Sequence, residues 1–154
     1  MEKAIDKSRY PRHLARKAVL QAMYEHLLND ENDIEILIKD VLEFTEIPKS
    51  SMDFFRNLLE SALDRREFAD SIIESVAENW ALERIDIIDR SILRIGIAEF
   101  LDFPTISQKV TIDEAVELAK EFGSKDSTKF VNGVLDAAFR RLTDMKLIKK
   151  EDGQ

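Results

Sequence analysis

The sequence predicts an all-α protein. Only 4 glycines and 3 prolines occur in 154 residues, which leaves little material for a β-rich fold with many tight turns. Apolar residues recur at spacings of three and four along most of the chain, which is the period of amphipathic helices. The chain is long enough to bury a core without a cofactor, and it contains no cysteine for disulfides or thiolate chemistry.

The first two helices are delimited by proline and by a capping residue. We expect one helix over residues 10–29, with Pro11 in its first turn, where the missing N–H of proline is tolerated. A second helix is expected to start after Asp33. It should stop before Pro48, because the residue before a proline disfavours the helical conformation.

The middle of the chain predicts a long helical stretch and then a buried helix. Ser51 is expected to cap the stretch, which reaches Trp80 and should break near Arg65, since helices of about 30 residues are uncommon in small domains. The segment 86–101 is apolar on most of its circumference. It is therefore expected to be the central helix, ending before Pro104.

Two further helices complete the prediction. Thr111 and Glu114 fit the S/T-x-x-E capping box, so a helix is expected to begin there and to close at Gly123. The final helix should begin at Asp126 or Ser127 and run to about residue 145.

The domain organisation follows from the absence of linkers and repeats. We expect a single domain over residues 1–154, with an N-terminal helical subdomain over about 9–80 and a C-terminal one over about 81–146. The charged tail over 147–154 is expected to fray. No window approaches the roughly 18 apolar residues that span a bilayer, and the N-terminus lacks an apolar signal region, which predicts a soluble cytoplasmic protein.

Gly133 lies in an unexpected context. Asn132-Gly133 between apolar residues is typical of a hairpin turn, but the flanking apolar positions fall in one helical arc of roughly 100°. A helix is therefore favoured, although an interior glycine costs about 1 kcal/mol relative to alanine. Because Gly133 lies off that arc, we expect a second helix to pack closely against it, with a ligand approaching the helix as the alternative.

Charge is distributed unevenly around a net value of −8. Residues 1–24 are basic, with six Lys/Arg against two Asp/Glu, residues 25–102 are acidic, with eight against twenty, and residues 103–154 are balanced, with nine against nine. The basic start predicts a ridge on the first helix, formed by Arg9, Arg12, His13, Arg16 and Lys17. Cations near a helix N-terminus oppose its dipole, which indicates an anionic partner; the alternatives are a solvated face or ion pairs with the acidic middle segment.

Lys129 and Phe130 lie in the first turn of the final helix. An aromatic ring beside a cation can stack an RNA base while the cation holds phosphate. The alternative is that Phe130 is a core residue.

Several motifs together resemble the bacterial NusB family of transcription antitermination factors. The resemblance covers about residues 9–140. It is carried by Arg12-x-x-Ala15-Arg16, Gln21-Ala22-Met23-Tyr24, Trp80, Asp89-Arg90-Ser91-Ile92-Leu93-Arg94, Val110-Thr111-Ile112-Asp113-Glu114-Ala115-Val116-Glu117-Leu118-Ala119-Lys120 and Lys129-Phe130-Val131-Asn132-Gly133-Val134-Leu135-Asp136.

The resemblance implies a fold and a set of partners. The fold would be two small packed bundles of about seven helices, without catalytic activity or cofactor. The partners would be boxA RNA, the ribosomal protein NusE and the antitermination complex on RNA polymerase at ribosomal RNA operons. Some family members also self-associate, and the sequence leaves a homodimer open.

By position, the resemblance implies two sets of site residues. The RNA-binding set, with Arg9 added from the basic ridge, is Arg9, Arg12, His13, Arg16, Arg94, Asp126, Ser127, Lys129 and Phe130. The NusE-facing set is Tyr24 and Asp89, with neighbouring acidic residues. No metal-ligand or catalytic motif is found, and the competing interpretation is a helical protein–protein adaptor without specific RNA binding.

Overall fold

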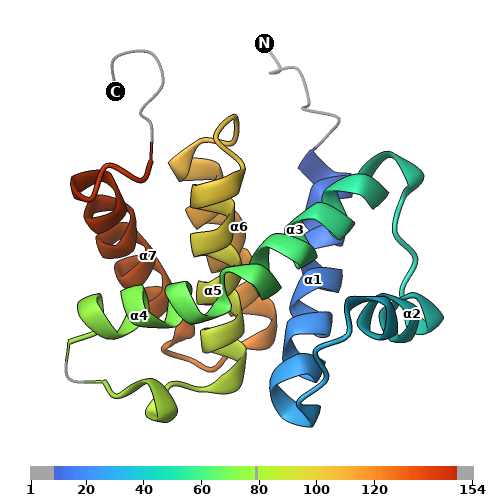
Figure 1. Cartoon of the computed structure of the whole chain (residues 1–154), viewed down its shortest axis with the longest axis horizontal. Helices are drawn as coiled ribbons and strands as arrows, with labels where there is room; N and C mark the ends of the chain where they lie inside the picture. Colours follow the sequence, from blue (N-terminus) through green and yellow to red (C-terminus); the bar gives the residue numbers. More distant parts are fainter. Residues whose placement is uncertain (1–8, 79, 149–154) are drawn as a thin grey trace.

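The computed structural model describes residues 9–78 and 80–148. Within them the chain forms seven α-helices and two short 3₁₀ turns, and no strand is present in this part of the chain (Figure 1). The helices are α1 (Arg9–Asn29), α2 (Ile34–Phe44), α3 (Met52–Asp64), α4 (Arg66–Val76), α5 (Ile87–Asp102), α6 (Gln108–Phe122) and α7 (Ser127–Asp144). The all-α prediction is confirmed.

Helix α5 lies at the centre of the fold. It packs against α1 and α3 on one side and against α4, α6 and α7 on the other, so the two helical groups share it (Figure 1). Its consecutive residues from Ser91 to Phe100 are all buried, which agrees with the apolar circumference of this segment. The hydrophobic core is one continuous cluster that runs through both groups, so the subdomain boundary near residue 80 stays a prediction.

Most predicted helix ends agree with the structure. The Asp33 carboxylate accepts a hydrogen bond from the Glu35 N–H at 2.9 Å and caps α2. Helices α3 and α4 are separated at Arg65, and Gly123 ends α6. Capping side chains and prolines act locally, which explains why the sequence located these ends well.

The predicted capping box is wrong. Helix α6 begins one turn earlier, where the Ser107 hydroxyl accepts a hydrogen bond from the Val110 N–H at 3.2 Å. Thr111 and Glu114 are interior residues of the helix and are buried. The S/T-x-x-E spacing also places both side chains on one helix face, and here that face points toward α1 and α5.

Two smaller expectations are also corrected. The Ser51 hydroxyl does not cap α3 but donates to the Pro48 carbonyl at 3.2 Å. A Cβ built on Gly133 meets no atom of the described residues within 4 Å, so none of the seven helices packs closely there. The helical spacing correctly placed Gly133 off the apolar arc, but it could not show whether another helix occupies that side.

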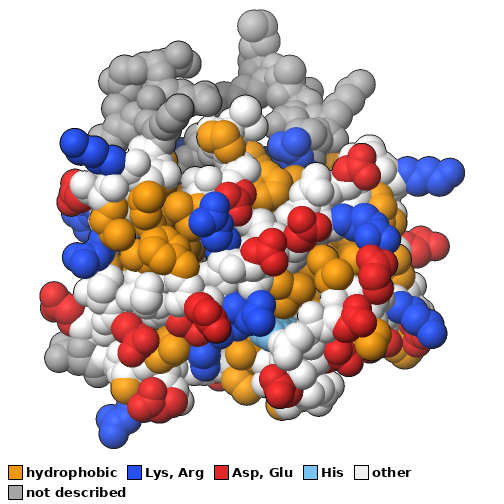
Figure 2. Space-filling view, viewed as in Figure 1, with side chains coloured by type: hydrophobic (Ala, Val, Ile, Leu, Met, Phe, Trp, Pro, Cys, Tyr) orange, Lys and Arg blue, Asp and Glu red, His pale blue; other side chains and the backbone are white. Residues whose placement is uncertain are grey.

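The surface mixes charges of both signs. On the face shown in Figure 2, acidic and basic side chains alternate, with hydrophobic side chains gathered over α7. Among the described residues, no helix is long and apolar enough to cross a membrane. The predicted frayed tail lies almost wholly outside the described residues.

Candidate nucleic-acid interface

The N-terminal half of α1 binds a carboxylate of α6. Arg9 Nε donates to Glu114 Oε2 at 3.3 Å, and His13 Nδ1 lies 3.0 Å from Glu114 Oε1. Glu114 is only 4% exposed, so it holds these side chains from inside the molecule. Lys17, one turn on, forms an ion pair with Glu121 at 2.9 Å. The predicted ridge is therefore largely ion-paired, mostly with α6 and not with the acidic middle segment.

Arg16 is the exception within the ridge, because it points into the core. Its Nη2 and Nε donate to the two carboxylate oxygens of Glu99 at 2.6 and 3.0 Å, and Thr111 Oγ1 donates to the same carboxylate at 2.9 Å. Arg16 and Glu99 are each 1% exposed. The surface position predicted for Arg16 is wrong, since this carboxylate comes from α5, far along the chain, and draws the guanidinium inward.

Arg12 keeps contact with solvent. It is partly exposed, and its guanidinium lies 4.9 Å from the centre of the Phe54 ring, on which the Arg16 guanidinium also lies at 5.0 Å. A cation over an aromatic face is oriented by the ring, and its positive charge is not neutralised as it would be by a carboxylate. Arg12 is thus positioned as a surface cation beside Arg9 and His13.

Arg94 is also buried. It makes a bidentate pair with Asp70, with Nε–Oδ1 at 2.8 Å and Nη2–Oδ2 at 2.6 Å, and Arg90 donates to the same carboxylate at 2.9 Å. Burial would raise the pKa of Asp70, but the hydrogen bonds from Arg94 and Arg90 outweigh it and hold that pKa below its usual value. Arg94 is 4% exposed, so its predicted surface position is wrong and its place is structural.

The first turn of α7 presents the remaining predicted residues. Asp126 and Lys129 are exposed, and Phe130 is half-buried. Ser127 is buried and accepts a hydrogen bond from the Ser124 N–H at 2.9 Å, which fixes the loop before the helix. Asp126 occupies the position that precedes the helix, but its side chain makes no capping hydrogen bond.

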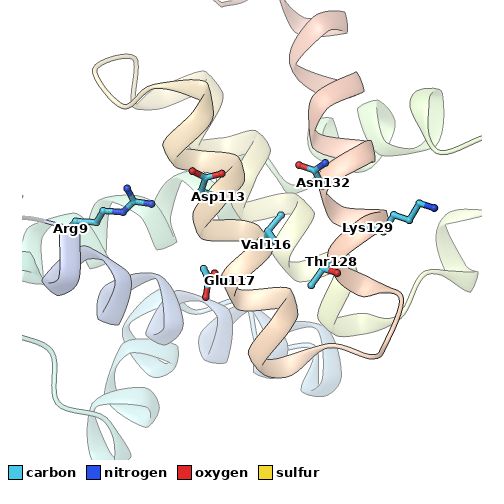
Figure 3. Close-up of a pocket in the computed structure, with 7 residues that line it drawn as sticks. All are labelled: Arg9, Asp113, Val116, Glu117, Thr128, Lys129 and Asn132. Carbon is cyan, nitrogen blue, oxygen red and sulfur yellow. The ribbon is translucent and has the colours of Figure 1, made fainter.

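A groove of about 440 Å³ brings the two basic regions together. Its lining combines Arg9 of α1, residues of α6 and residues of α7, as Figure 3 shows: Arg9, Asp113, Val116, Glu117, Thr128, Lys129 and Asn132. Arg9 reaches toward Asp113, whereas the Lys129 side chain points away from it on the far side of the groove (Figure 3). The predicted basic elements therefore share one face, with two carboxylates between them that the sequence did not single out.

Phe130 contacts the other aromatic residue of this region. Its ring and that of Trp80 form an edge-to-face pair with centroids 6.0 Å apart. Trp80 is 51% exposed. The sequence offered one signal for this residue, a tryptophan within the motifs that resemble the NusB family, but its exposure and its contact with Phe130 depend on the packing of α4 and α7.

The two residues predicted to face a protein partner have different surroundings. Tyr24 is 37% exposed and lines a groove between α1 and α2 that also contains Glu25 and Asp40. Asp89 is only 8% exposed. The expectation that it lies on the exposed surface facing the protein partner is therefore wrong. Burial raises the pKa of its carboxyl, and the Ser127 hydroxyl opposes the rise.

Comparison with known proteins gives a consistent result. The model of the NusB family matches residues 13–140. The transcription antitermination protein NusB of Salinibacter ruber is 39% identical over 139 residues, which cover 88% of this chain and 85% of that protein. The protein of the same name from Dictyoglomus thermophilum is 36% identical over 135 residues, 88% of each chain.

A solved structure extends the similarity to the fold. It is described as antitermination factors NusB and NusE in complex with dsRNA, and the matching chain superposes with a TM-score of 0.77 at 28% identity. The match covers 86% of this chain and 98% of that chain. The match of the family model over residues 13–140, together with relatives that are similar over most of their length, shows that this chain belongs to the NusB family.

Proposed function

We propose that this protein is a transcription antitermination factor that binds boxA-type single-stranded RNA together with NusE. In this role it helps to assemble the antitermination complex on RNA polymerase at ribosomal RNA operons, in the cytoplasm. The role is one of binding, and no residue is assigned a catalytic function. The named relatives and the solved complex of NusB with NusE and RNA support this proposal.

The observation that carries the RNA part is that Arg9 and Lys129 line the same groove, at its two sides. Phosphate contacts require cations at spaced positions along a surface, and bases require exposed aromatic faces. Arg12 and His13 adjoin Arg9 on α1, and Phe130 follows Lys129 on α7. We assign RNA contact to these five residues, whereas Arg16, Arg94 and Ser127 hold the helices that present them.

The protein part of the proposal rests on the acidic groove around Tyr24. Glu25, Asp40 and Glu43 line it together with the apolar side chains of Leu28 and Phe44. Acidic surfaces attract basic proteins and orient them on approach. We propose that NusE approaches from the Tyr24 side of α1, whereas Asp89 is buried in α5 beside Ser127.

An adaptor that binds only proteins is the second candidate. The ion pairs of Arg9 and His13 with Glu114 favour it, because they reduce the positive charge available to phosphate. The two candidates differ in their response to salt. An RNA-binding site loses about 0.7 log units of affinity per log unit of salt for each phosphate neutralised on a single strand.

The test is a titration of the full chain with boxA RNA, a scrambled RNA and a duplex of the same length, with and without NusE. Measurements at two salt concentrations give the number of phosphates neutralised. The proposal expects preference for boxA in the presence of NusE and a clear salt dependence. Equal affinity for the scrambled strand would favour the adaptor.

A further inference from the structure

A second groove lies between the end of α4 and the start of α7. Its volume is about 230 Å³, and it is lined by Val76, Ala77, Glu78, Trp80, Lys129, Phe130, Gly133 and Val134. The C-terminal end of α4 forms one wall, and the first two turns of α7 form the other. Among the described residues, no side chain of this groove makes a hydrogen bond or an ion pair with another residue, although backbone groups of Ala77, Trp80 and Phe130 are hydrogen-bonded.

The groove combines an exposed aromatic surface with an open helix backbone. Trp80 is half exposed, and the edge-to-face contact with Phe130 fixes the orientation of its indole. At Gly133 an added Cβ would meet no atom within 4 Å in the part of the chain that the structure describes. The helix backbone at Gly133 is therefore open to the groove, although alanine would stabilise an exposed helix position.

Close packing was the structural explanation expected for this glycine, and the geometry excludes it. A glycine in a helix interior also serves where a ligand must approach the backbone closely. Here that position faces the same space as the indole ring, so a planar group could lie on the indole with its edge over the backbone at Gly133.

Lys129 connects this groove with the basic face. It lines both this groove and the one that contains Arg9, so a chain of phosphates crossing the first turn of α7 would pass it. The occupant that matches a planar aromatic surface, a free helix backbone and an adjacent cation is a nucleotide with its base unstacked from its neighbours.

We propose that the groove between α4 and α7 is a subsite for one unpaired nucleobase, which stacks on Trp80 and reaches over Gly133 while Lys129 holds its phosphate. This inference rests on the proposed RNA-binding function and deepens it, because it assigns a base-binding position to Trp80 and Gly133, which are not among the five residues assigned RNA contact above. Stacking on aromatic side chains tolerates any base. The subsite therefore determines where the RNA strand runs on the surface and contributes little to the selection of its sequence.

The first experiment uses Trp80 as a reporter, since it is the only tryptophan in the chain. Short boxA single strands are titrated into the full-length protein, with NusE present, while tryptophan fluorescence and the anisotropy of end-labelled RNA are recorded; any NusE tryptophan is replaced beforehand. Stacking should quench the fluorescence over the same RNA concentrations that change the anisotropy. An RNA series with one abasic nucleotide at successive positions should contain one member that binds without quenching.

The second experiment uses Gly133→Ala. The added methyl group should raise the melting temperature by about 2–4 °C because alanine favours the helix. The same change should weaken RNA binding several-fold, since it occupies the space of the base. Trp80→Ala should weaken binding by roughly 5- to 100-fold, and Trp80→Phe should retain most of the affinity. Met145→Ala, at a 45% exposed apolar residue that follows the last turn of α7 and lines neither groove, should change nothing.

The outcomes separate the subsite from the function. If the labelled RNA binds with the expected salt dependence but quenching is absent and Trp80→Ala and Gly133→Ala bind normally, the subsite is refuted and the function stands. If no RNA binds under any condition, both fail. If Trp80→Ala loses affinity for NusE alone and keeps affinity for RNA, the groove is a protein contact and the subsite is refuted.

Discussion

Arg16 and Glu99 form a bidentate ion pair in the interior, with the guanidinium Nη2 2.6 Å from Oε1 and Nε 3.0 Å from Oε2. The pair joins α1 to the central helix α5. Removing two charges from water is costly, and the attraction between them compensates only if the geometry and the remaining hydrogen bonds are good. Here Thr111 supplies a further donor to Glu99, so the pair contributes to the position of α1 as well as to stability.

Breaking this pair on one side should be strongly destabilising. Arg16→Met leaves a buried carboxylate without its cation, and we expect a loss of about 3–5 kcal/mol in the free energy of unfolding. The double variant Arg16→Met, Glu99→Leu removes both charges and should recover most of that loss. Urea denaturation of the two variants and of Lys17→Met, at a partly exposed neighbour, measures the difference. Equal losses in the single and double variants would contradict this account of the pair.

Glu114 should restrain the affinity for RNA. Its carboxylate accepts from Arg9 and His13 and lies 3.5 Å from Arg16, so Glu114→Gln leaves more positive charge on the α1 face. We expect RNA affinity at low salt to rise several-fold, together with a steeper salt dependence, and the free energy of unfolding to fall. The matched control is Asp136→Asn, which breaks an exposed ion pair with Arg140 on α7. A Glu114→Gln variant that is folded and unchanged in affinity would show that Arg9 and His13 do not face phosphate.

Asp126→Asn should raise RNA affinity without changing stability. The Asp126 carboxylate is exposed, makes no capping hydrogen bond and precedes the basic turn of α7. Removing one negative charge a few ångströms from a phosphate strengthens binding about two- to five-fold at low salt. Paired measurements of RNA affinity and of the melting temperature test both parts. A fall in affinity at constant melting temperature would mean that Asp126 orders the RNA site.

The Glu25–Asp40 contact should make stability depend on pH. Burial, followed by the hydrogen bond and repulsion from Asp40, raises the pKa of Glu25 from 4.5 to about 7. The folded protein therefore holds a proton here that the unfolded chain releases near pH 4.5, so this contribution to stability is complete below pH 4.5 and is lost as the pH rises to about 7. Melting temperatures of Glu25→Gln should exceed those of the wild type at pH 8 and match them at pH 5. Glu60→Gln, on the exposed surface of α3, is the control, and the same shift at both pH values would contradict the coupling.

The helices could be predicted from the sequence because their signals are local. Asp33 and Gly123 act on the backbone within a few residues of themselves, and the apolar period of 86–101 identifies the central helix without any knowledge of its neighbours. The same reasoning failed where a side chain has a distant partner. The spacing of Thr111 and Glu114 indicated a helix cap, but both side chains form hydrogen bonds with residues of other helices.

The candidate site was predicted in part, for a related reason. Helical spacing placed Arg12 and Arg16 on the same side of α1, but one turn separates a partly exposed residue from a buried one. Whether a cation faces solvent depends on where carboxylates of other helices lie, and Arg16 and Glu99 are 83 residues apart. Likewise, the space around Gly133 and Trp80 exists only once α4 and α7 are packed together.

The long sequence separation between Arg16 and its carboxylate partners affects the order of folding during synthesis. While the ribosome is still producing the first 98 residues, the guanidinium on α1 has neither Glu99 nor Glu114 to bind. The opening helix can form early, but it cannot settle into the interior with its charge unmatched. Completion of the fold must therefore wait until α6 has emerged, and a messenger truncated before that point would yield a chain whose first helix stays exposed to chaperones and proteases.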